Sequence, residues 1–276
     1  KPKLTDDFIQ KITAQANKPI DDLVAGGGII SYSENETGSE SGQIGRFTFS
    51  IASRKSTEAA MALYPTTLNI FDGNKQITTK KYEYLSPIGS VQIKTKNQLT
   101  KIFKLFTIGA HCCVSLAPVS VVGNQIYVGE LLGVMNTDII SRDQFFVRDD
   151  ELYKIVYDDR FSYYNMSFAG STAAFFPMIY LIDEKGFTPV QGQFKDFYEK
   201  LYQTTVKGLE QIESRLINWE DPSIAEYLYG KKIYTYAIGY LAGHNRPELK
   251  TRLTSSWPNL VFNEEEIFTY VSKTKN

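Results

Sequence analysis

The stretch FKDFYEKLYQTTVKGLEQIESRLI, residues 194–217, decides the fold class, because its apolar residues repeat at helical spacing. The repeating positions follow i, i+3, i+4 and i+7, with Glu and Lys between them: Phe194, Phe197, Tyr198, Leu201, Tyr202, Thr205, Leu209, Ile212, Leu216 and Ile217. Before this stretch, apolar residues occur in short runs separated by turn residues, a pattern typical of strands. The change of period after Pro189 therefore predicts an α+β chain.

The preceding region, residues 46–186, predicts an antiparallel β-rich body, either a sandwich or barrel-like. Strands are predicted at 46–51, 66–71, 76–84, 90–94, 144–148, 151–157, 161–168 and 174–182. The least polar part, 107–140, is the predicted core of the sheet, and the regular turn spacing is typical of sandwiches and barrels. Residues 97–106 predict a short helix instead, because Leu99, Ile102 and Phe103 share a helical face.

Both ends of the chain are predicted to be helical. Residues 4–24 predict an amphipathic helix that Pro19 breaks, and the polar residues 34–45 predict a mobile loop. At the other end, 222–241 and 264–271 predict further helices after the long one. The sequence thus predicts three parts: an N-terminal helical arm with a mobile loop (1–45), the β-rich body (46–186) and a helical C-terminal third (187–276).

Composition excludes several protein classes. The chain has 276 residues, of which 42% are hydrophobic and 22% charged, so disordered and collagen-like chains are excluded. No apolar run is long enough to predict a membrane span. The two cysteines, Cys112 and Cys113, are adjacent and would close almost no loop as a disulfide, which favours a reducing, cytoplasmic location. Glycosylation sequons at Asn35 and Asn165 point the other way, and a processed secreted chain would also lack a signal peptide.

A local excess of lysine is the clearest charge anomaly. The whole chain has a net charge of −1, but residues 75–104 hold seven lysines against Glu83 alone. Lysines interleaved with aromatics can hold the phosphates of single-stranded nucleic acid while the rings stack on bases. The candidate nucleic-acid-binding residues are Lys75, Lys80, Lys81, Tyr82, Lys94, Lys96, Lys101 and Lys104. The alternative is a solvated strand face whose lysines discourage edge-to-edge pairing.

The segment His111-Cys112-Cys113 is the only cluster of nucleophilic groups in the sequence. A cysteine nucleophile needs a base that accepts its proton, and the chain offers only His111 and His244. Cys113 with either histidine would make the chain a cysteine-dependent hydrolase or transferase. The alternative is ordinary core packing, because cysteine is among the most buried residue types.

The sequence predicts neither a cofactor nor a metal site. It contains no P-loop, no GxGxxG and no CxxC or HxxxH spacing. The acidic pairs Asp149-Asp150 and Asp158-Asp159 could ligate a cation or act as glycosidase carboxylates, but their position at predicted strand ends favours turns.

The aromatic stripe on residues 194–217 has two interpretations, a core-packing face or an assembly surface formed by Phe194, Tyr198 and Tyr202. Without a coherent catalytic constellation, the sequence favours a structural, self-assembling interaction protein over an enzyme. The β-rich body with terminal helical arms suggests a viral or phage-type homo-oligomer that engages nucleic acid through its lysine-rich face. A plain protein-binding module that uses Tyr198 and Tyr202 is a further possibility.

Overall fold

The computed structural model describes most of the chain, which folds into two compact units. The described residues are 6–26, 31–35, 39–53, 65–83, 85–106, 112–135, 145–158, 160–161, 164, 172–215, 222–254 and 262–275. The β unit comprises residues 27–156 and 179–189, and the helical unit comprises 1–26, 157–178 and 190–276. Both units are therefore discontinuous in sequence.

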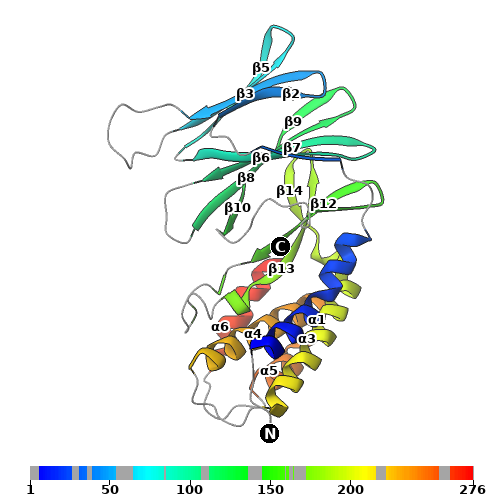
Figure 1. Cartoon of the computed structure of the whole chain (residues 1–276), viewed down its shortest axis with the longest axis vertical. Helices are drawn as coiled ribbons and strands as arrows, with labels where there is room; N and C mark the ends of the chain where they lie inside the picture. Colours follow the sequence, from blue (N-terminus) through cyan, green and yellow to red (C-terminus); the bar gives the residue numbers. More distant parts are fainter. Residues whose placement is uncertain are drawn as a thin grey trace, which may run out of the picture. The chain divides into compact units, whose positions relative to one another are not determined.

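The strands form three antiparallel sheets (Figure 1). The central sheet has the order β1-β6-β7-β8-β10, with β9 also paired to β8, and the other two have the orders β2-β3-β4-β5 and β11-β12-β13-β14. The strand bounds are β1 Ser31–Asn35, β2 Ser39–Ile44, β3 Phe47–Ser53, β4 Thr66–Asp72, β5 Lys75–Tyr82, β6 Ser86–Lys94, β7 Gln98–Phe106, β8 Cys112–Val122, β9 Gln125–Val128, β10 Leu132–Met135, β11 Phe145–Arg148, β12 Glu151–Asp158, β13 Phe176–Asp183 and β14 Gly186–Pro189.

The central sheet is buried on both faces. On β7, Phe103 joins the core shared with β2–β5, where its ring lies edge-on to Phe49 with centroids 5.3 Å apart. The neighbouring Ile102 points to the opposite face and joins the core shared with β11–β13. Because successive side chains of a strand point to opposite faces, such a central strand needs apolar residues at nearly every position.

The helix predicted at 97–106 is wrong, because these residues form strand β7, which is buried on both faces. Leu99, Ile102 and Phe103 fit helical spacing only because both faces of the strand are apolar. The predicted mobile loop at 34–45 is also corrected, since β2 lies inside it and pairs along its whole length with β3. Its serines and glycine occupy an edge strand, where only Ile44 is buried.

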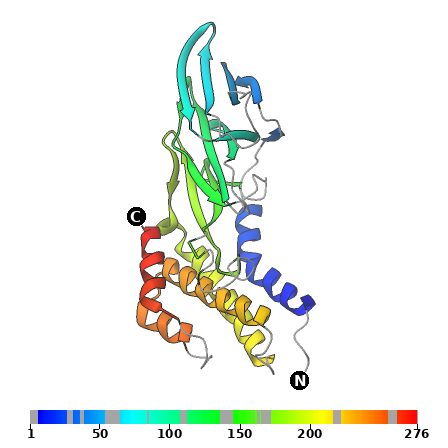
Figure 2. The same ribbon diagram turned by 90° about the vertical axis from the view of Figure 1, so that its left-hand side faces the viewer.

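Among its described residues, the helical unit has five α-helices: α1 Asp6–Ala25, α3 Lys195–Arg215, α4 Pro222–Ala242, α5 Arg246–Thr254 and α6 Glu264–Ser272, with the 3₁₀ turns η2 Thr172–Ala174, η3 Gln191–Phe194 and η4 Lys273–Lys275. Helix α1 continues through Pro19, which was predicted to break it, and bends along its course (Figure 2). Among the described residues, none of these helices is long and apolar enough to cross a bilayer. The predicted α+β class, with helical N- and C-terminal segments around an antiparallel β-rich part, is confirmed.

Candidate functional site

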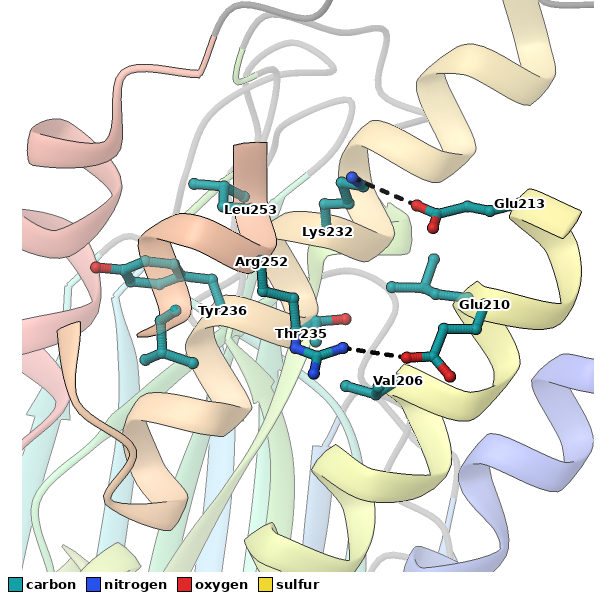
Figure 3. A pocket seen from close by; sticks show the side chains of 10 residues that line it. Val206, Glu210, Glu213, Lys232, Thr235, Tyr236, Arg252 and Leu253 are labelled. Atoms are coloured by element: carbon teal, nitrogen blue, oxygen red, sulfur yellow. Dashed lines mark hydrogen bonds and ion pairs between the residues drawn. The ribbon is translucent and has the colours of Figure 1, made fainter. Parts of the chain in front are cut away.

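A pocket of about 130 Å³ lies between α3, α4 and α5 (Figure 3). Its lining combines an apolar floor with charged side chains, and consists of Val206, Leu209, Glu210, Glu213, Lys232, Thr235, Tyr236, Leu249, Arg252 and Leu253. All three helices belong to the helical unit, so the site is complete within one compact body.

Helix α4 supplies a buried cation, Lys232, to the pocket. From Leu228 to Leu241 this helix is buried on nearly every side, so its residues are almost all apolar or aromatic. Lys232 interrupts this run, and its side chain is only 4% exposed. The Lys232 ammonium Nζ lies 3.3 Å from Glu213 Oε1 on α3, and Figure 3 shows the two side chains meeting above the pocket.

Burial and the charge of Arg252 both affect the pKa of Lys232. Desolvation of the ammonium lowers the pKa of Lys232, and the positive charge of Arg252 lowers it further. The Glu213 carboxylate opposes both effects without cancelling them. Lys232 and Arg252 both line the pocket, and each contacts a glutamate of α3.

Arg252 forms the outer side of the pocket. Its Nη1 atom lies 3.4 Å from Glu210 Oε1 on α3, and its guanidinium carbon lies 5.8 Å from the centroid of the Tyr202 ring. The Arg252 and Glu210 side chains are 42% and 63% exposed. Such an exposed pair contributes only about 0–1 kcal/mol, so the guanidinium can exchange Glu210 for another anion at little cost.

A separate hydrogen-bond network holds the far wall of the pocket. The Tyr236 hydroxyl donates to Glu264 Oε1 at 2.5 Å and points away from Lys232 and Arg252 (Figure 3). Arg246 donates to both oxygens of Glu264 at 2.9 Å, and this contact, aided by Tyr236, lowers the pKa of Glu264. The network fixes the Tyr236 ring while its hydroxyl takes no part in the pocket.

Both ring nitrogens of His244 contact carboxylates. Nε2 lies 2.6 Å from Glu199 Oε2, and Nδ1 lies 3.2 Å from Glu248 Oε1. In this arrangement the imidazole ties α3 to α5. Strand β8 contains Cys112 and Cys113, but their side chains and His111 lie outside the described residues, so a pair of Cys113 with His111 or His244 remains a prediction.

The structure does not bring the predicted lysines onto one face. Lys101 is buried, with its Nζ 2.6 Å from Glu40 Oε1, while Lys80 and Lys96 contact Glu130 and Asp150. Tyr82 is buried in the core between two sheets. Alternation along each strand places Lys81 opposite Lys80 on β5, and Lys104 opposite Lys101 on β7. Of the seven predicted lysines, Lys75, Lys81, Lys94 and Lys104 form no ion pair with a described residue.

The prediction of an assembly surface is wrong for these three residues. Phe194, Tyr198 and Tyr202 are all buried inside the helical unit. The Tyr198 hydroxyl donates to the carbonyl oxygen of Pro177 at 3.1 Å, and the Tyr202 ring lies 4.3 Å from that of His244. The stripe is therefore a core-packing face, the other interpretation of the same spacing.

The acidic pairs are parts of turns where the structure describes them. Asp149 and Asp150 have positive φ angles of 53° and 65° and connect β11 to β12, as in a tight hairpin. Asp158 contacts Arg160 at 2.8 Å. Within the part of the chain that the structure describes, no group of three or more His, Cys, Asp or Glu side chains is arranged to hold a metal.

Sequence reasoning missed the pocket, although one signal was present. Lys231 and Lys232 stand in a helical run that is otherwise mainly apolar and aromatic, and a lysine there requires a partner or a cavity. The partners come from α3 and α5, whose packing the sequence alone does not reveal. Comparisons with protein-family models, with curated protein sequences and with solved structures returned no match.

Proposed function

We propose that the helical unit binds a small organic anion, a short-chain carboxylate, in the pocket between α3, α4 and α5. The observation that carries the proposal is that two cations from different helices, Lys232 and Arg252, line one pocket together with apolar side chains. A few placed polar groups above an apolar floor are the usual composition of small-molecule sites.

The volume limits the size of the ligand. An apolar cavity of about 150 Å³ accommodates benzene, so a pocket of this size fits an acid of about three to four carbons. Val206, Leu249 and Leu253 would cover the carbon chain. Longer acids would extend past the exposed Arg252–Glu210 pair.

The charges favour an acid over a neutral molecule. Arg252 presents a planar set of donors that matches a carboxylate, and a carboxylate between it and Lys232 would relieve their mutual repulsion. Glu210 and Glu213 each contact one of these cations. The anion would displace the weak, exposed contact of Glu210.

Isothermal titration calorimetry with lactate and with its uncharged amide tests this proposal. Charge-assisted hydrogen bonds contribute about 1.5–3 kcal/mol, so Arg252→Gln should weaken lactate binding by about 10- to 100-fold. Lys250→Gln is the matched control, since it removes one positive charge from the same helix at a residue that is not part of this pocket's lining. Equal binding of lactate and its amide, or unchanged affinity of Arg252→Gln, would contradict the proposal.

A second candidate function, engagement of single-stranded nucleic acid by a self-assembling chain, is supported by one observation. Lys75, Lys81 and Lys94 on the β unit are exposed and have no ion pair with a described residue. If they contact phosphates, their triple replacement by Gln should reduce the salt dependence of oligonucleotide binding, measured by fluorescence anisotropy. Light scattering of the same samples would report assembly, and an unchanged salt slope would eliminate these lysines as a nucleic-acid site.

A further inference from the structure

The pocket places an amine and a guanidinium at two separate positions. Lys232 Nζ enters from α4 beside Glu213, while Arg252 enters from α5 beside Glu210. Simple carboxylate binding explains the guanidinium but does not require a buried lysine. A ligand with a carbonyl carbon next to its carboxylate would use both groups, the guanidinium for the carboxylate and the amine for the carbonyl.

We propose that Lys232 forms a reversible imine with a small α-keto acid whose carboxylate contacts Arg252. The inference rests on the proposed function, because it places the acid in the same pocket. It adds a covalent step and a substrate class, α-keto acids, that carboxylate binding alone does not imply.

The covalent step needs a neutral amine. Burial and the charge of Arg252 both lower the pKa of Lys232, which increases the neutral fraction of this lysine relative to a surface lysine. Glu210 and Glu213 on α3 and Arg252 on α5 are the charged groups that line the pocket with it. Of these, Glu213 is the one in contact with Nζ, at 3.3 Å.

The reaction balances without an oxidant or a metal. The neutral Lys232 nitrogen attacks the carbonyl carbon, a C–N bond forms, and the carbonyl electron pair moves onto oxygen. Glu213 is placed to carry the two protons of the amine nitrogen to this oxygen in turn, the first giving the carbinolamine and the second releasing its hydroxyl as water. The products are the imine and one water molecule, and hydrolysis reverses the step.

The neighbouring Lys231 provides a matched control. Burial lowers the pKa of Lys231 to about 8, so it is also more reactive than an ordinary lysine. Its Nζ lies over the rings of Tyr234 and Tyr227, 4.5 Å and 5.9 Å from their centroids, and it does not line the pocket. Reactivity that arises from burial alone would label Lys231, whereas reactivity that arises from the pocket would label Lys232.

Reductive trapping with pyruvate and sodium cyanoborohydride, followed by intact mass and peptide mapping, tests the proposal. We expect one adduct on Lys232, no adduct at this site in Lys232→Met, and an unchanged adduct in Lys231→Met. Labelling of Lys231, or equal labelling across surface lysines, would overturn the inference. Circular dichroism of Lys232→Met would establish that the variant is folded.

Arg252→Gln keeps the amine and gives a test that does not depend on the Lys232 variant. It should slow trapping of pyruvate by at least about tenfold more than trapping of acetone, which has no carboxylate and reports only the effect of the Arg252 charge on the amine. Equal slowing of both would overturn the role of Arg252. Lactate lacks the keto carbonyl, so it tests carboxylate binding alone. Lactate binding that depends on Arg252, without a pyruvate adduct, would reject the imine and retain the proposed carboxylate site. Absence of both lactate binding and the pyruvate adduct would reject both proposals.

Discussion

Gly239 on α4 faces the ring of Tyr202 on α3 so closely that a Cβ atom at position 239 would lie 2.8 Å from Tyr202 Cε2. The same atom would lie 2.6 Å from Leu249 Cδ2 on α5. Real Cβ atoms do not approach other atoms so closely, so a glycine at this point lets the three pocket-forming helices meet. The proposed ligand site therefore depends on a residue that contributes no side chain.

Gly239→Ala should destabilise the protein by about 1–3 kcal/mol, because the added methyl group overpacks a core that has no room for it. Urea denaturation followed by circular dichroism would measure the change. Gly192→Ala is the matched control, since a Cβ there meets nothing within 4 Å, and it should change stability little. Equal stability of the two variants would show that α3, α4 and α5 separate easily.

Lys101→Met should destabilise the β unit by about 3–5 kcal/mol, the typical effect of removing one partner of a buried ion pair. Lys101 and Glu40 are 8% and 13% exposed, and the Glu40 carboxylate also accepts a hydrogen bond from Ser90 Oγ at 2.7 Å. Thermal denaturation would measure the loss, with exposed Lys94→Met as the control. A stable Lys101→Met variant that had lost nucleic-acid binding would restore this residue as a ligand contact.

Lys231→Met should stabilise the protein below about pH 8, where the buried amine must be charged. Burial places the pKa of Lys231 below its ordinary value of 10.5, so the unfolded chain binds more protons between these two values and the wild type gains stability as pH rises through that window. Urea midpoints measured on both sides of the window would show the wild type rising and the variant staying flatter. Parallel pH profiles would show that Lys231 is solvated in the folded protein.

Glu264→Gln should cost about 1.5–3 kcal/mol at neutral pH, because the charge-assisted hydrogen bonds from Arg246 are lost. Since the pKa of Glu264 is lowered, its contribution is present above the ordinary value of 4.5 and is lost as pH falls through the lowered pKa. Acid titration of stability would therefore separate wild type from variant only above this range. Glu265→Gln on the neighbouring, exposed residue should cost at most about 1 kcal/mol, and a larger loss there would place the main contact of Arg246 on Glu265.

The long helix was predictable because its apolar spacing was regular over many turns. The structure ends α3 at Arg215, close to the predicted end, and α4 and α6 lie within a few residues of their predicted bounds. The strands β4, β12 and β13 were equally predictable from the sequence, since turn residues bracket each of them. Local patterns suffice where apolar spacing is regular over several turns or where turn residues bracket a segment.

β7 shows where such patterns stop being informative. Its residues pack on two different sheets, so its apolar positions carry no alternation and fit a helix equally well. The role of Lys101 was hidden for a related reason, because its partner Glu40 is distant in the sequence and lies on a strand whose residues are typical of a loop. The aromatic stripe on α3 fits both burial and exposure until the elements that cover it are known.

By itself, the sequence determined the class of the fold, the main helices and most of the strands, because hydrophobic periodicity and turn residues act over short distances. Tertiary structure alone decided which lysines are neutralised, that Tyr198 and Tyr202 are core residues, and that Lys232 and Arg252 share a pocket. These outcomes depend on contacts between residues far apart in the chain. The environment of a charged or aromatic side chain is set by such partners, and a single sequence does not encode them as a local pattern.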